Sequence, residues 1–361
     1  MRVVVVGGYG NFGTYVARSL AGDRAITLII AGRDLGKAQA AARDLGNGVE
    51  AGLYDISGPA EALAKLRPDL VINMVGPYNE QGYAVAEAAI ACGAHYCDIA
   101  DAREFVAAIG QLDEQARAAG VAALAGASSV PALTAAYLDA AAEVMTIRSV
   151  TYGISGAEQA NRGAGTVAAV LAYVGQRFTT LREGRMEAVT GWSDTHAVEY
   201  PELGRRWFGR GNVPDLALFL GRYPTLQTQE FWAGHEIALL HFGTAVLGKL
   251  ASVGVLPRLD RFAGLLSRLS KPFNRFGRSR SGFHMVIEGE GVDGSPVIRR
   301  HFIIARQGHG PYLPCIPVIL IARKLSRGEA PESGARPAFG TFTLAEFREA
   351  CAELDVSFID P

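Results

Sequence analysis

Short apolar runs alternate with amphipathic segments through the first third of the chain. The runs contain few polar residues, as strands buried on both faces do, and the segments between them carry apolar residues at helical spacing. This alternation predicts an α/β domain with a doubly wound parallel sheet and helices on both of its faces. The expected strands are 2–6, 25–31, 49–53, 70–75, 95–99 and 121–125, and the expected helices are 14–20, 35–45, 59–66, 82–92 and 103–119.

The pattern changes after Pro131, where a helix over 132–145 is expected to lead into a second domain. Strands are expected at 147–154, 186–190, 196–200, 283–291 and 297–305, with a helix at 165–180. The last two strands flank Asp293-Gly294, a strong hairpin signal, and 196–200 is a candidate partner of 186–190. Together these segments predict a largely antiparallel sheet, with one face available for a homodimer contact.

Three glycines follow the first expected strand in the order Gly8-x-Gly10-x-x-Gly13, and a helix is expected to begin directly after them. This strand–turn–helix context is the one that the dinucleotide fingerprint requires. Gly8 makes the tight turn, Gly10 lets the backbone approach a pyrophosphate, and Gly13 lets the helix pack close to the strand. The amides at the helix start, from Asn11 and Phe12 onward, then face the anion. A tight turn without a ligand is the alternative.

The second expected strand ends in Gly32-Arg33, where an NAD-specific fold usually places an acid that holds the ribose 2′-OH. A guanidinium suits a 2′-phosphate, which a carboxylate would repel. Arg33 therefore predicts NADP(H) as the cofactor, with a solvated surface arginine as the alternative. The neighbouring Asp34 is positioned to cap the helix over 35–45.

Other candidate contacts lie at the carboxyl ends of the expected strands, where ligands of such sheets bind. Asp55 either reaches the adenine or caps the following helix. Asn73 and the backbone of Gly76 are expected near the nicotinamide half, with a plain turn as the alternative.

Composition and charge exclude several classes of protein. A formal charge of −1 gives no electrostatic case for nucleic-acid binding. The four cysteines form no C-x-x-C motif and have no cluster of histidines beside them, so neither a metal site nor a disulfide framework is expected. Reduced thiols fit a cytoplasmic protein, and the N-terminus enters a strand without a signal-peptide pattern.

Residues 237–256 are apolar but interrupted by His241 and Lys249, and they fall short of the ~20 clean residues that a spanning helix needs. Basic residues then interleave with phenylalanines, against the single acid Asp260. The basic residues are Arg258, Arg261, Arg268, Lys271, Arg275, Arg278 and Arg280, and the aromatic ones are Phe262, Phe273 and Phe276. Such a stretch can lie on a membrane surface, but we favour a solvated helix that covers the second domain or gates its cleft.

Three stretches resemble the saccharopine dehydrogenase-like family of NADP-binding oxidoreductases in their order and spacing. They are VVVVGGYGNFG, VINMVGPYNEQGYAVAEAAIACGAHYCDIA and LAGASSVPALTAAYLDA, and the segment GHGPYLPCIPVILIARKLSRGEAPESGARPAFGTFTLAEF is similar to the closing segment of the family. The similarity covers roughly residues 1–175 and 305–357. Where members that handle aminodicarboxylates read GLDPG, residues 128–132 read SSVPA, so an acidic residue is absent there.

The resemblance implies a Rossmann domain formed by both chain ends, with a mixed α+β domain inserted. The expected boundaries are 1–130 plus 312–361 for the dinucleotide-binding domain and 131–311 for the substrate and dimerisation domain. Known members use NADP(H) to reduce imines or related groups of amino acids and polyamines, and some relatives act on carbon–carbon double bonds in lipid pathways. The apolar run 316–322 also needs a partner surface, which predicts that the closing segment docks on the first domain.

Catalysis is expected to rest on placing a small-molecule substrate against the nicotinamide, with one proton donor. Tyr-x-x-x-Lys, G-x-S-x-G and zinc patterns are absent. The candidate donors are His309, which lies between two glycines, and Tyr78. An exposed turn histidine and a packing aromatic are the respective alternatives. The leading hypothesis is an NADP(H)-dependent oxidoreductase that acts on C=N or C=O. The alternatives are a reductase of C=C in a lipid-type substrate at a membrane surface, and a non-catalytic NADP-binding protein.

Overall fold

The computed structural model describes residues 1–159 and 163–360, and the chain divides into two compact units. The first unit comprises Met1–Ala136 and Tyr312–Ala350, and the second comprises Tyr137–Pro311 and Cys351–Pro361. The expected assignment of residues 351–360 to the dinucleotide-binding domain thus differs from the structure, because these residues lie in the second unit.

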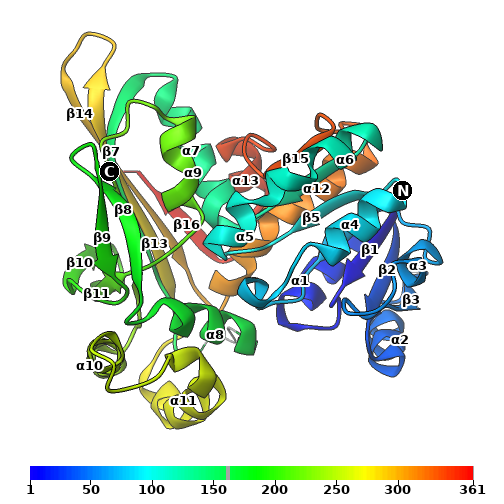
Figure 1. The fold of residues 1–361 in the computed structure, drawn as a ribbon, viewed down its shortest axis with the longest axis horizontal. Coiled ribbons are helices and arrows are strands. Elements are labelled where there is room, and N and C mark those ends of the chain that lie inside the picture. The colour runs from blue at the N-terminus through cyan, green and yellow to red at the C-terminus, as the bar shows by residue number, and fades with distance from the viewer. Residues whose placement is uncertain (160–162, 361) are drawn as a thin grey trace. The chain divides into compact units, whose positions relative to one another are not determined.

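The first unit contains a seven-stranded parallel sheet in the order β15-β6-β5-β4-β1-β2-β3 (Figure 1). At its centre Val4 pairs with Ile29 on one side and with Val71 on the other, and all three side chains are buried. The doubly wound α/β fold class is therefore confirmed. The strands are β1 (Arg2–Val6), β2 (Thr27–Gly32), β3 (Glu50–Leu53), β4 (Leu70–Asn73), β5 (His95–Asp98), β6 (Ala122–Ala125) and β15 (Gly334–Pro337).

The helices of this unit follow the strands in sequence as the pattern predicts, with one difference. They are α1 (Asn11–Leu20), α2 (Leu35–Leu45), α3 (Glu61–Ala64), α4 (Ala84–Ala91), α5 (Arg103–Ala107) and α6 (Asp113–Ala118). A single helix over 103–119 was wrong, because a 3₁₀ turn at Ile109–Leu112 separates α5 from α6. Ile109 and Leu112 are both buried, so the turn still contributes two apolar side chains to the core.

The closing segment supplies helices α12 (Ile316–Ser326) and α13 (Leu344–Ala350) to the first unit. Every residue from Ile316 to Ala322 is buried. The Arg323 guanidinium donates a hydrogen bond to the carbonyl of Ser19 at 3.0 Å, and the rings of Tyr15 and Tyr312 stack with centroids 4.1 Å apart. The apolar run therefore packs against α1, at the opposite end of the sequence.

The second unit contains a nine-stranded mixed sheet with a path β10-β11-β12-β7-β13-β14-β16. All pairs along this path are antiparallel except β12 with β7. The expected hairpin is confirmed as β13 and β14, and Gly294 in its turn has a φ of +79°. The strands are β7 (Met145–Ser155), β8 (Arg177–Arg182), β9 (Arg185–Thr190), β10 (His196–Tyr200), β11 (Gly204–Arg210), β12 (Thr228–Gly234), β13 (Ser281–Gly291), β14 (Pro296–Ala305) and β16 (Val356–Ile359).

Two expectations for this unit were wrong. The helix expected over 165–180 is α8 (Gly163–Tyr173), and β8 begins at Arg177, where aromatic and β-branched residues replace the helical pattern. Strands β9 and β10 do not pair with each other, since β9 pairs with β8 and β10 pairs with β11. The remaining helices are α7 (Thr134–Ala142), α9 (Asp215–Arg222), α10 (Ala238–Ser252) and α11 (Ala263–Ser270).

The second sheet curls, which brings an edge strand near strands four and five places away. Tyr200 in edge strand β10 contacts β13, where its hydroxyl lies 2.6 Å from Nδ1 of His284. Its ring also meets Phe302 of β14 at a centroid distance of 5.3 Å. The concave face so formed holds a core cluster of Tyr200, Phe208, Trp232, Phe302 and Ile304.

Two further properties concern the whole described chain. Within residues 1–159 and 163–360, no helix is both long enough and apolar enough to cross a membrane. The four cysteines are free thiols. The homodimer stays a prediction.

The buried histidine of the concave core predicts sensitivity to acid. Burial lowers the pKa of His284 to about 3, whereas an unfolded histidine has a pKa near 6.5. The unfolded state therefore binds a proton as the pH falls below about 6.5 and the folded state does not, so stability is lost through that window. Between pH 7.5 and 5, His284 contributes about 2 kcal/mol of this loss.

Urea unfolding of the parent and of His284→Asn at both pH values tests this expectation. The variant should show the smaller loss on acidification. Tyr200→Phe removes the same hydrogen bond but keeps the imidazole buried, so it should retain the parent's loss. An unchanged pH dependence in His284→Asn would contradict the expectation.

Candidate dinucleotide site and a polar cavity

The loop between β1 and α1 brings its two ends into very close contact. Gly7 has a φ of +78°, in the left-handed region that glycine tolerates best. A Cβ on Gly13 would lie 2.2 Å from the carbonyl oxygen of Gly7, so only glycine permits this approach of helix to loop. These two positions turn the chain sharply from the buried strand into α1.

The outer side of the same loop is open. Gly10 is exposed, and a Cβ there would meet only the Gly7 carbonyl, at 3.1 Å. Gly10 also precedes the first turn of α1, which contains no acidic residue and begins with Asn11 and Phe12. The first amides of a helix and its dipole attract an anion. The loop is therefore open to the pyrophosphate of a dinucleotide, although the left-handed turn that the sequence assigned to Gly8 lies at Gly7. Contact of Gly8, Gly10 and Gly13 with a nucleotide stays a prediction.

The acid beside Arg33 is already engaged. The Asp34 carboxylate caps α2 by accepting a hydrogen bond from the amide of Lys37 at 3.0 Å, and that bond lowers the pKa of Asp34. The Lys37 ammonium lies 3.5 Å from the same carboxylate. Arg33 itself is exposed, and within residues 1–159 and 163–360 no hydrogen bond or ion pair holds its side chain. The guanidinium is thus available to an anionic ligand at the end of β2.

Tyr9 is a residue of this region that the sequence reasoning missed. Its hydroxyl accepts a hydrogen bond from the Asp34 amide at 3.2 Å. A Cβ on Gly32 would lie 2.4 Å from the same hydroxyl, so the tyrosine ring covers Gly32 directly before Arg33. The only sequence signal was a large aromatic residue inside a glycine loop. Tyr9 forms a wall between the glycine loop and the end of β2.

Asp55 is exposed after β3, and its carboxylate accepts the amide of Ser57 at 2.9 Å. This contact is a local turn rather than the cap of α3, which begins later at Glu61. Gly76 is exposed in the turn after β4. Contact of either residue with a nucleotide stays a prediction.

Polar side chains at the ends of β4 and β5 form one buried hydrogen-bonded group. The Tyr78 hydroxyl donates to the carbonyl of Asn73 at 2.8 Å, and the Asn73 amide donates to the Tyr96 hydroxyl at 3.4 Å. Tyr96 donates in turn to Asp98 at 2.9 Å. Burial raises the pKa of Asp98 to about 6, although the amides of Ala100 and Gly126 stabilise its charged form.

These contacts bear on two predicted site residues. The Oδ1 of Asn73 accepts the amide of Val75 at 3.1 Å, so both polar atoms of this side chain are committed within the protein. Tyr78 is 5% exposed, and burial raises its pKa well above the ordinary value. Its hydroxyl proton is directed to a backbone carbonyl, which supports the packing interpretation of Tyr78 over a role as proton donor.

His309 lies in the second unit, in the loop that follows β14, whereas Tyr78 lies in the first. The imidazole Nδ1 accepts a hydrogen bond from the amide of Asp355 at 2.8 Å. A neutral ring held in this way carries its proton on Nε2. His309 is therefore an oriented and half-buried side chain rather than an exposed turn residue.

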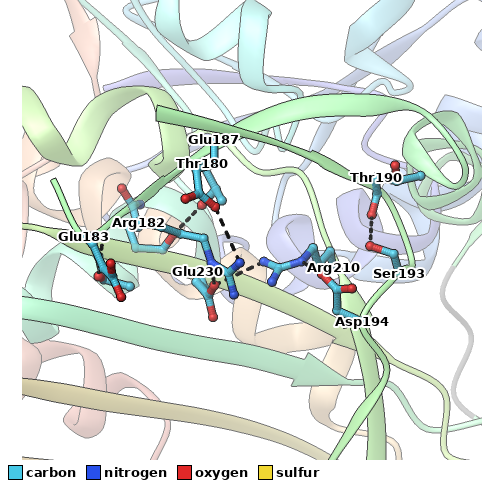
Figure 2. A network of polar contacts seen from close by, with 11 residues as sticks. Thr180, Arg182, Glu183, Glu187, Thr190, Ser193, Asp194, Arg210 and Glu230 are labelled. Carbon is cyan, nitrogen blue, oxygen red and sulfur yellow. Dashed lines mark hydrogen bonds and ion pairs between the residues drawn. The ribbon is translucent and has the colours of Figure 1, made fainter. Parts of the chain in front are cut away.

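A polar cavity of about 510 Å³ lies within the second unit. Figure 2 shows Arg182 and Arg210 converging on Glu230 there. Both guanidinium groups donate to the same carboxylate oxygen, Arg182 at 2.7 Å and Arg210 at 3.2 Å, and Arg210 also pairs with Asp194. The lining residues are Thr151, Arg182, Asp194, His196, Arg210, Glu230 and Trp232.

Arg210 is the most deeply placed charge of this cavity, with 3% of its side chain exposed. Its guanidinium carbon lies 4.6 Å from the centroid of the Trp232 ring, which His196 meets edge-on at 4.2 Å. Burial lowers the pKa of His196, so the ring packs there in its neutral form. The sequence reasoning missed this network. Its one signal was charge at inward positions of β11 and β12, namely Arg210 and Glu230.

Comparison with known proteins agrees with the geometry of the first unit. Residues 3–124 match the family model described as the saccharopine dehydrogenase NADP binding domain. The first unit therefore contains an NADP-binding domain of the saccharopine dehydrogenase type, and the resemblance seen in the sequence is confirmed. No curated protein sequence matches the chain.

Solved structures of similar fold extend over the whole chain. Apo saccharopine dehydrogenase (L-Glu forming) from Saccharomyces cerevisiae aligns with a TM-score of 0.69 and 15% identity, covering 100% of this chain and 99% of the yeast chain. Homospermidine synthase from Legionella pneumophila, in complex with NAD, aligns with a TM-score of 0.57 and 11% identity, covering 99% and 91%. At such low identity these likenesses establish the fold alone.

The family match confirms NADP(H) as the cofactor to the extent that the matched domain is NADP-binding. It also supports the class of oxidoreductases, since the domain is that of a dehydrogenase. Preference for NADP(H) over NAD(H) and the bond that is reduced stay predictions.

The ion network of the second unit predicts a strong effect on stability. In Arg210→Met, Glu230 keeps Arg182 but loses its buried partner. Removing one member of a buried ion pair costs about 3–5 kcal/mol, and the remaining arginine places the expected loss at the lower end. Arg205→Met is a matched control in the same strand, because Arg205 is exposed, and it should cost less than about 1 kcal/mol. Urea unfolding measures both, and equal losses would contradict the assigned role of Arg210.

Proposed function

We propose that this protein is an NADP(H)-dependent oxidoreductase that transfers a hydride to or from C=N or C=O of a small molecule. The observation that carries the proposal is the open glycine loop of 7–13 beside the exposed Arg33, which has no ion-pair partner among the residues that the structure describes. The neighbouring acid is engaged as a helix cap. The matched domain supports the cofactor class. The nicotinamide, when bound, supplies or accepts the hydride.

Different residues of the first unit are proposed to bind different parts of the cofactor. The loop backbone at Gly10 and the start of α1 receive the pyrophosphate. Arg33, with Lys37 one helical turn away, receives the 2′-phosphate, for which a planar guanidinium offers paired hydrogen bonds. The Asp34 carboxylate stays ionised, but the Lys37 ammonium 3.5 Å away offsets its charge, and the Lys37 amide holds it in place as the cap of α2.

Hydride delivery to C=N or C=O builds negative charge on nitrogen or oxygen, which a nearby acid neutralises. We propose His309 as this acid, with its proton on Nε2 and its ring held through Nδ1 by the Asp355 amide. Tyr78 is the weaker candidate, since its proton is held by the carbonyl of Asn73. The absence of an acid from residues 128–132 argues against a substrate whose amine would need one there.

A second candidate function is reduction of C=C in a lipid-type substrate. One observation favours it, namely that exposed apolar side chains concentrate in residues 237–280 of the second unit. A panel assay distinguishes the candidates by following NADPH oxidation with aldehydes, with 2-oxo acids plus amines, and with long-chain 2-enoyl compounds. NADPH binding without turnover on any of them would instead favour the non-catalytic alternative.

The cofactor assignment predicts the effect of removing Arg33. Hydrogen bonds to a charged group are worth about 1.5–3 kcal/mol, so Arg33→Ala should weaken NADPH binding roughly 10- to 100-fold. NADH binding should change little, because NADH has no 2′-phosphate. Arg43→Ala is the matched control, since Arg43 is also exposed but lies in the last turn of α2. Calorimetric titration gives all the dissociation constants. Equal affinities of the parent for NADPH and NADH would contradict the assignment of Arg33 to the 2′-phosphate.

The proton-donor assignment predicts a different signature for His309→Gln. Turnover should fall by about 10²–10⁴, the usual contribution of general acid catalysis, while the dissociation constant of NADPH stays within about twofold. Tyr78→Phe should leave kcat within a few-fold and cost about 1 kcal/mol of stability through its lost hydrogen bond. Steady-state kinetics with the best substrate of the panel test both. A larger kcat loss in Tyr78→Phe would exchange the two roles.

A further inference from the structure

Exposed apolar side chains are concentrated in one part of the second unit. We define residues 237–280 as the basic apolar segment, which contains α10, a 3₁₀ turn at Leu259–Phe262, α11 and a second 3₁₀ turn at Lys271–Phe276. Of the sixteen large hydrophobic side chains exposed in the described chain, nine lie in this segment. They are Leu239, Phe242, Val246, Val253, Val255, Phe262, Leu265, Leu269 and Phe276.

Helix α10 packs on the second unit with one side and exposes apolar side chains on the other. Its inner side is fixed to the unit, since Trp192 donates to the His241 carbonyl at 3.1 Å. A Cβ on Gly248 would lie 2.8 Å from Val174, so the helix packs closely there as well. Phe242 and Val246, four residues apart, are 41% and 60% exposed on the other side. A helix facing water normally carries polar residues at such positions.

Basic residues far outnumber acidic ones in the basic apolar segment. It contains eight lysines and arginines and one acid, Asp260, which gives a formal charge of +7 in a chain of net charge −1. Arg258 pairs with Asp260 at 2.7 Å. Within residues 1–159 and 163–360, the other seven basic side chains have no ion-pair partner, and most of them are exposed. The rest of the chain therefore carries a formal charge of −8.

We propose that the basic apolar segment is a docking surface for an anionic lipid bilayer. Apolar side chains of an interfacial segment enter the boundary between headgroups and acyl chains, while lysines and arginines pair with headgroup phosphates. Both kinds of side chain are interleaved here. In α11, for example, Arg268 lies between Leu265 and Leu269, and all three are exposed. Charge complementarity selects an anionic membrane over a neutral one, and this proposal does not depend on the reaction catalysed.

Co-sedimentation of the full chain with vesicles tests the proposal. Vesicles of phosphatidylcholine with phosphatidylserine should bind the protein at least about tenfold more strongly than phosphatidylcholine alone, and added salt should weaken the binding. Two triple variants should each bind the anionic vesicles at least about tenfold more weakly than the parent. The charge variant is Arg261→Glu/Arg268→Glu/Lys271→Glu, and the apolar variant is Leu265→Ser/Leu269→Ser/Phe276→Ser. The far-ultraviolet circular dichroism spectra and urea unfolding midpoints of the parent and both variants should agree, which shows that the variants are folded.

Matched controls come from the β13–β14 hairpin of the same unit. Val292→Ser/Ile298→Ser removes two exposed apolar side chains, and Arg299→Glu/Arg300→Glu reverses two exposed charges. Neither should change vesicle binding. Loss of binding in these controls to the same degree as in the segment variants would overturn the assignment of the surface to 237–280.

A fluorescence measurement that uses none of the segment variants guards against the failure of those variants to fold. The Trp207 ring lies 5.0 Å from Phe242, whereas Trp192 and Trp232 are buried. Lipids brominated on their acyl chains should therefore quench the tryptophan fluorescence of the parent and much less that of Trp207→Phe. Absence of both quenching and sedimentation with anionic vesicles overturns the proposal. A parent dimer that the apolar variant converts to a monomer, without vesicle binding, would assign the surface to a second copy instead.

Discussion

The contact between the backbone of Gly7 and that of Gly13 determines where the chemistry of the first unit can occur. Because a Cβ on Gly13 would lie 2.2 Å from the Gly7 carbonyl, α1 begins directly above the end of β1. The helix start and its dipole then point at the edge where the parallel strands end. The Asp34 cap of α2, the exposed Arg33 and the buried group around Asp98 are arranged along that same edge, at the ends of β2 and β5.

The second unit holds charged side chains beside an apolar core. Its sheet curls so that Tyr200 reaches His284, and the enclosed concave face holds both an apolar core and charged groups. Arg210 is tolerated there because Asp194 and Glu230 pair with its nitrogens and Trp232 covers its face. The two units therefore carry different chemistry, with backbone amides and the exposed Arg33 in the first and a self-compensated ion network in the second.

Charge is distributed unevenly along the chain, and this distribution bears on what the protein binds. A net charge of −1 conceals a segment of +7 and a remainder of −8, so the overall value is a poor guide to what the protein binds. The same segment also holds most of the exposed large apolar side chains, and solvated helices rarely combine both features. Local patterning, and not composition, is what sets this surface apart from the rest of the molecule.

The sequence by itself determined the features that rest on local rules. Buried strands such as 2–6, the glycine fingerprint, the Asp34 cap and the Asp293-Gly294 hairpin each follow from neighbours in the chain. Only the tertiary structure decided which distant residues meet: Tyr9 over Gly32, Tyr78 with the Asn73 carbonyl, Arg182 and Arg210 on Glu230, and β16 beside β14. Such contacts depend on how strands pair and curl. Pairing energies are spread over many residues, so no short stretch of sequence encodes them.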